Sequence, residues 1–64
     1  MYVVEAIPNT QEWRDEIGGA CMPVFEGTQA ECVAYVNTHN TLETSPYEGW
    51  NPQTDGELKI VEVM

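Results

Sequence analysis

Apolar positions predict a strand at each end of the chain and a third strand between them. Residues 2–7 are apolar and β-branched, and residues 58–64 have the same character, so both segments are typical of strands. A further strand is expected at residues 20–25. Pro23 within it indicates an edge position, because proline cannot donate a hydrogen bond to a sheet.

A helix is predicted over residues 28–39. Thr28 is a good N-cap residue, and Glu31 stands where a capping box requires an acid. Apolar residues then recur at helical spacing and are expected to pack on the sheet; they are Ala30, Val33 and Ala34, extended by Tyr35 and Val36. The fold class is therefore α+β, a small β-β-α-β domain with one helix packed on a three-stranded, mostly antiparallel sheet. If the second and last strands are parallel across the helix, the first strand pairs antiparallel with both.

The 64 residues have room for one domain, residues 1–64, with a thin core. One helix covers only one face of a sheet, whereas the terminal strands carry apolar residues on both faces. A monomer would leave part of this surface exposed, including Val3, Ile7, Val61 and Val63. Because a large exposed apolar patch usually marks an interface, we expect self-association through the sheet, as a homodimer.

Charge narrows the class of partner. The chain has eleven acidic residues against Arg14 and Lys59, a net charge of -9. Nucleic-acid binding needs basic residues to displace counterions from phosphates, and anionic membrane surfaces also attract basic segments. We therefore expect a basic protein surface as partner, with no direct nucleic-acid or membrane binding. The alternative is that the acidity only confers solubility.

The cysteines and the start of the chain predict a cytoplasmic protein. The sequence opens on a strand-like run with no basic segment or apolar signal core before it. In a reducing compartment, Cys21 and Cys32 are expected to be free thiols. No apolar stretch approaches the length of a membrane span.

Catalytic and cofactor motifs are not found. Ser45 is the only serine, and it precedes Pro46 in a turn. Cys32 and His39 are seven residues apart on one predicted helix, about 10 Å along its axis, so they cannot share a metal ion or a proton. The other spacings fit neither a zinc site nor a phosphate loop. The interpretation is a protein that is not an enzyme and carries no cofactor or metal.

Two segments mix aromatic rings with acids and are the candidate partner-binding segments. The first is the long loop 41–57, longer than a structureless connection usually is without a function. The second is the connection at residues 12–16. The candidate residues are Glu43, Tyr47, Glu48, Trp50, Asp55 and Glu57 in the loop, and Trp13, Asp15 and Glu16 in the connection. Both tryptophans are candidate binding anchors, or alternatively fold back to enlarge the core.

These features favour a small protein-binding module that occupies a basic, nucleic-acid-binding surface of a larger host or defence protein. In size, charge and lack of an active site, the chain resembles the general style of phage-encoded inhibitors and DNA mimics. One alternative is a homo-oligomeric structural or adaptor protein. Another is a small-ligand sponge, a protein that sequesters its ligand, formed at the interface of a dimer. Anionic nucleotides are disfavoured as its ligand, because the chain has only two basic residues that could bind their phosphates.

Overall fold

The computed structural model describes residues 1–64 and contains three strands and two helices. In chain order they are β1 (Tyr2–Pro8), α1 (Gln11–Ile17), β2 (Met22–Gly27), α2 (Gln29–His39) and β3 (Gly56–Glu62). The strands form one sheet in the order β2-β1-β3, with β1 antiparallel to both neighbours. The predicted α+β class and the pairing of the first strand are confirmed. The order β-β-α-β is incomplete, because a helix lies between the first two strands.

The position of β1 in the middle of the sheet follows from its apolar residues. Val4 and Ala6 are fully buried on the face that α2 covers, while Val3 and Ile7 are half-buried on the opposite face. β2 is an edge strand, as Pro23 predicted. Its pairing with β1 is irregular between Val4 and Glu5, where an extra residue of β2 is accommodated.

Helix α1 was not predicted, because its seven residues mix charges with only two apolar side chains. Its end signals are nevertheless present in the sequence. The Thr10 side chain accepts a hydrogen bond from the Trp13 amide at 3.2 Å, which caps the first turn. Gly18 ends the helix in the left-handed region, with φ 106°, and its amide bonds to the Arg14 carbonyl.

Helix α2 has the predicted capping box, but its buried face was predicted correctly only at Tyr35 and Val36. The Thr28 amide donates to the Glu31 carboxylate at 2.9 Å, and the Glu31 amide donates to the Thr28 hydroxyl at 3.2 Å. The predicted stripe Ala30, Val33 and Ala34 is exposed. Cys32 is fully buried instead, and the half-buried residues that follow it at helical spacing are Tyr35, Val36 and His39.

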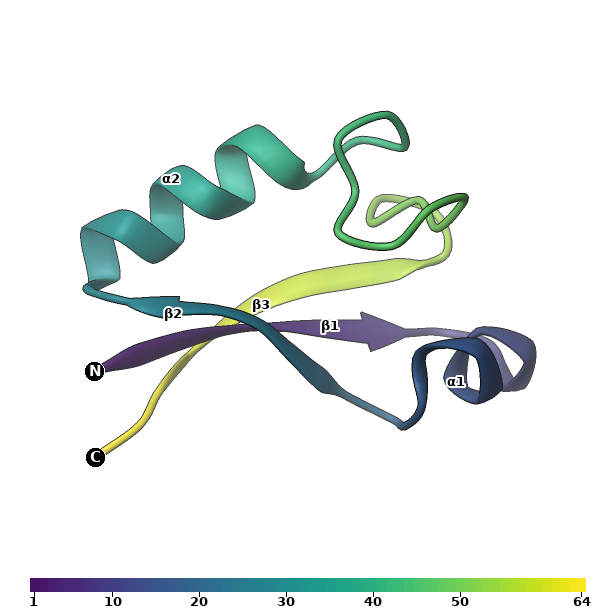
Figure 1. Ribbon diagram of the computed structural model, residues 1–64, viewed down its shortest axis with the longest axis horizontal. Helices are drawn as coiled ribbons and strands as arrows, with labels where there is room; N and C mark the ends of the chain where they lie inside the picture. The colour runs from purple at the N-terminus through teal and green to yellow at the C-terminus, as the bar shows by residue number, and fades with distance from the viewer.

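The core lies between the sheet and the segments that cover one of its faces. Its centre is a cluster of Ala6, Ile17 and Trp50, contributed by β1, α1 and the loop after α2. The partly buried side chains packed against this cluster are Trp13, Met22, Val24, Tyr47 and Leu58. The loop, residues 40–55, consists of turns and lies beside α2 above the same face of the sheet (Figure 1). It is shorter than the predicted 41–57, because Gly56 and Glu57 belong to β3.

The other face of the sheet has no layer packed on it (Figure 1). The strand registers place Val3 beside Val61 and Glu5 beside Lys59 on this open face, with Ile7 at its end. Lys59 therefore has an acidic cross-strand neighbour in Glu5. Neither helix has the length and apolar character needed to span a membrane.

Candidate functional site

An acidic hollow lies where α1 meets the loop after α2. Its volume is about 700 Å³, within the range of ligand sites. We call this cavity the acidic hollow, and the residues that line it are Glu12, Trp13, Asp15, Glu16 and Glu48. Four of the five lining side chains are carboxylates, and neither Arg14 nor Lys59 is among the lining residues. The hollow therefore presents negative charge around one aromatic ring.

Helix α1 supplies most of the acidic hollow through the spacing of its residues. Glu12, Asp15 and Glu16 are three and four residues apart, so they lie on one side of the helix. Trp13 and Ile17 are also four apart, and both pack toward the core. Ile17 is buried, whereas Trp13 is half-buried and lines the hollow as well. The packed side of α1 thus fixes how its acids are presented.

The loop brings Glu48 to the same place. The next residue, Gly49, has a φ of 80°, and a Cβ built on it would lie 3.8 Å from the Cη2 atom of Trp13. The loop backbone therefore passes close to the Trp13 ring. On either side of Glu48 and Gly49, the rings of Tyr47 and Trp50 pack edge to face at 6.0 Å, which anchors this turn to the core.

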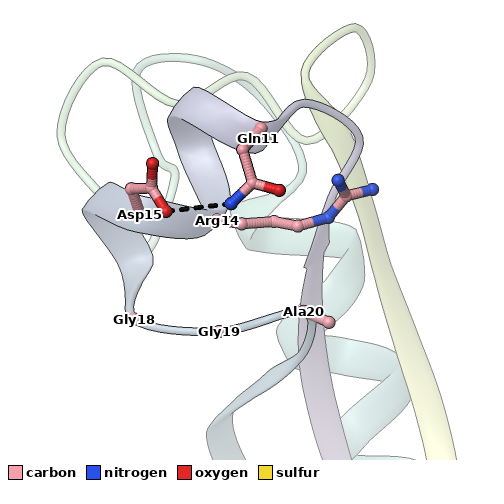
Figure 2. Close-up of a pocket in the computed structure, with 6 residues that line it drawn as sticks. All are labelled: Gln11, Arg14, Asp15, Gly18, Gly19 and Ala20. Carbon is pink, nitrogen blue, oxygen red and sulfur yellow. Dashed lines mark hydrogen bonds between the residues drawn. The ribbon is translucent and has the colours of Figure 1, made fainter.

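Arg14 lies outside the acidic hollow and lines a different one. A second, smaller hollow of about 350 Å³ is lined by Gln11, Arg14, Asp15, Gly18, Gly19 and Ala20. Figure 2 shows the Arg14 guanidinium pointing away from the Asp15 carboxylate. The Gln11 amide donates to Asp15 at 2.9 Å, as the dashed line marks. Asp15 lines both hollows, and its hydrogen-bond partner is a neutral amide.

The structure separates the predicted binding residues into three groups. Trp13, Asp15, Glu16 and Glu48 come together in the acidic hollow, although the sequence placed them in two separate segments. Tyr47, Trp50 and Asp55 build the loop and core, and Glu43 and Glu57 are exposed elsewhere.

Trp50 cannot serve as a binding anchor in this fold. Its side chain is fully buried, and its indole N–H donates to the Asp55 carbonyl at 3.1 Å. The alternative in which Trp50 folds back to enlarge the core is the observed arrangement. Tyr47 is also partly buried, because it packs against the core cluster. This burial raises the pKa of its hydroxyl above the ordinary value of 10.0. Asp55 is also structural, because its carboxylate accepts the Asn51 amide at 2.9 Å.

Glu12 lines the acidic hollow and lies in the predicted segment 12–16, but it was not named among the candidate residues of that segment. The signal that could have identified it is the helix itself. Thr10 as N-cap and Gly18 as the terminating glycine would have placed Glu12 on the same side as Asp15 and Glu16. No group of three or more His, Cys, Asp or Glu side chains is placed to hold a metal ion.

Comparison of the chain with protein-family models, with curated proteins and with solved structures found no match.

Proposed function

We propose that this protein is an acidic protein-binding module that docks on a basic surface of a larger protein through the acidic hollow. The observation that carries the proposal is the convergence of four carboxylates around Trp13 with no basic residue among them. The partner surface is one that otherwise holds nucleic acid, so binding is competitive, in the manner of an inhibitor or DNA mimic. No step of this mechanism requires catalysis or a cofactor.

The chemistry of the acidic hollow suits lysine and arginine side chains. Carboxylates attract their charge, and an indole face attracts a cation that lies over it. Trp13 packs against the core cluster but is only partly buried and lines the acidic hollow, so it can contact a partner without leaving its place in the fold. The net charge of -9 adds long-range attraction, which speeds encounter with a basic partner and makes it sensitive to salt.

We place this activity in the cytoplasm. Cys21 and Cys32 are both unpaired, which is the usual state of thiols in a reducing compartment. Nucleic-acid-handling host or defence proteins with basic grooves are available partners there.

An oligo-arginine peptide is a suitable probe for the acidic hollow. Binding should be measured by isothermal calorimetry at low and high salt for the wild type and two triple variants. The first reverses charges in the hollow, with Glu12→Lys, Glu16→Lys and Glu48→Lys. The matched control reverses exposed acids elsewhere and has the same net charge, with Glu26→Lys, Glu43→Lys and Glu62→Lys.

We expect the hollow variant to lose about tenfold or more in affinity relative to the control, because local charge pairs add to the long-range field. Chemical shifts of the Trp13 indole should move on binding in the wild type, while those of buried Trp50 should not. Equal losses in both variants would show that only net charge attracts the peptide, and would leave solubility as the role of the acids.

Self-association is a second candidate function, favoured by the open face of the sheet. Val3, Ile7 and Val61 are half-buried there, and no layer of the chain covers them. Under this proposal the protein is a homo-oligomeric structural or adaptor protein, and its acids keep the assembly dispersed.

A further inference from the structure

The outer edge of β3 carries backbone groups that have no partner within the chain. The Val63 amide bonds to the Met1 carbonyl at 2.8 Å, and the Asn9 amide bonds to the Asp55 carbonyl at 2.9 Å, on either side of the β1–β3 ladder. In an antiparallel pair, bonded and non-bonded positions alternate. Odd-numbered residues of β3 therefore bond to β1, and the amides and carbonyls of Gly56, Leu58, Ile60 and Glu62 point away from the sheet.

The two edges of the sheet differ in how well they could accept another strand. On β2, Pro23 lacks an amide hydrogen, and the irregular pairing opposite Val4 and Glu5 distorts the strand. Both features are known to protect edges from pairing. β3 has neither a proline nor an irregularity from Gly56 to Glu62. Outside the helices and strands, no backbone hydrogen bond of the chain involves these residues.

We propose that the β3 edge pairs antiparallel with the β3 edge of a second copy, with Leu58 opposite Leu58 of that copy. This joins the two sheets into one sheet of six strands, β2-β1-β3-β3-β1-β2. The inference rests on the self-association of the second candidate function, but it assigns the contact to the β3 edge and leaves the open face of the sheet uncovered. It uses no residue of the acidic hollow.

Charge complementarity selects this register among those centred on the strand. With Leu58 opposite Leu58, Glu57 of each copy faces Lys59 of the other, and symmetry makes two such pairs. If Leu58 instead faces Ile60, Lys59 meets Lys59 of the second copy. If Ile60 faces Ile60, Lys59 meets Val61, and Glu57 has no basic neighbour. Opposite charges across strands stabilise pairing and like charges oppose it.

Side-chain position supports the same register. Glu57 and Lys59 are exposed on the open face of the sheet. In the proposed register they occupy non-hydrogen-bonded positions, where side chains of neighbouring strands are closest. Leu58 lies on the other face, partly buried against the core cluster, so the pairing of two Leu58 residues extends an apolar layer that already exists.

Salt separates this association from binding to a basic partner. Two copies each carrying a net charge of -9 repel one another at long range, and salt screens that repulsion. Self-association is therefore expected to strengthen from low to moderate salt, whereas oligo-arginine binding weakens. Either proposal can fail while the other stands.

The test is sedimentation equilibrium of the full chain with a charge-swap cycle. Glu57→Lys and Lys59→Glu should each lower the association constant about tenfold, because each replaces two attractive pairs by two repulsive ones. The double variant should restore it. Glu26→Lys and Arg14→Glu match the net charges of the single variants at residues outside the β3 edge, and should change association far less.

Two results would overturn the proposal. One is a wild type that stays monomeric at moderate salt at every protein concentration measured. The other is a double variant that associates no better than its single variants. A chemically synthesised chain with an N-methyl group on Ile60 gives an independent check, because it replaces an outward-pointing amide hydrogen by a methyl group and leaves the β1–β3 hydrogen bonds in place. If this chain keeps the native circular dichroism spectrum yet associates like the wild type, the β3 edge is not the interface.

Discussion

The indole N–H of Trp50 donates to the main-chain carbonyl of Asp55 at 3.1 Å. This hydrogen bond ties the Trp50 ring to the turn formed by the residues that follow it in the loop. The same turn is held by Asn51, whose amide donates to the Asp55 carboxylate and whose carbonyl accepts the Asp55 amide at 2.7 Å. Trp50 is the largest fully buried side chain of the protein. The loop is therefore a structural layer that completes the core.

Replacing Trp50 should unfold the protein or nearly so. Trp50→Ala removes a buried ring, a change that costs about 3–5 kcal/mol, while a core of this size supplies about the same. Trp50→Phe keeps an aromatic ring but loses the hydrogen bond, so a smaller loss is expected. Thermal unfolding followed by circular dichroism would measure both. A Trp50→Ala variant with a wild-type midpoint would contradict the burial of this ring.

Gly56 should not tolerate even a methyl group. A Cβ built there would lie 2.6 Å from Cζ2 of Trp50 and 2.9 Å from Cα of Pro8, and closer still to the Ile7 carbonyl oxygen. Gly56→Ala therefore forces β1 and the Trp50 ring apart, at a cost of about 1–3 kcal/mol.

Gly19→Ala is the matched control for this substitution. Its Cβ would lie in ordinary contact, 3.6 Å from the Met22 sulfur, and it should unfold close to the wild type. Equal unfolding midpoints for the two variants in urea titrations would show that β3 is not packed as closely on Pro8 and Trp50 as the structure has it.

The strands and α2 could be predicted from sequence because their signals are local. β-branched runs mark β1 and β3, and Thr28 with Glu31 marks the start of α2. The buried face of α2 was mistaken because Ala30, Val33 and Ala34 form a plausible stripe. The fold instead buries Cys32, which behaves as a small apolar side chain. That choice depends on the angle at which α2 meets the sheet, and no local pattern specifies it.

The site was only partly predictable for a similar reason. The sequence indicated that Trp13, Asp15, Glu16 and Glu48 are surface candidates, but it placed them in two separate segments. Their convergence depends on the path of the loop past the Trp13 ring at Gly49, a contact between residues far apart in the chain. Trp13 is half-buried and Trp50 is fully buried, and this difference depends on the same path of the loop.

Acid should weaken α2 through its capping box. The hydrogen bonds from the Thr28 amide and hydroxyl hold the pKa of Glu31 below its ordinary value of 4.5. A lowered folded-state pKa gives stability that is present above the unfolded pKa and is lost as pH falls through the folded one. Glu31→Gln lacks this titration. The difference in unfolding midpoint between wild type and Glu31→Gln should therefore be constant above about pH 5 and shrink below about pH 4.

Comparing these two chains cancels the effect of the other carboxylates, which titrate in both. A midpoint difference that does not change with pH would contradict the charged capping box.

The two thiols should differ widely in reactivity, and the labelling rate of Cys32 should measure how often α2 separates from the sheet. Cys21 is exposed, whereas Cys32 is fully buried on the side of α2 that packs on the sheet. A thiol reagent should label Cys21 at once in the native protein and label Cys32 only through opening of the fold. Thr28→Ala removes the N-cap at a cost of about 1 kcal/mol, so it should raise the Cys32 labelling rate about fivefold when opening is a fast equilibrium and leave the Cys21 rate unchanged. Rapid labelling of both thiols in the wild type would show that α2 is not held on the sheet as described, because only that packing shields Cys32.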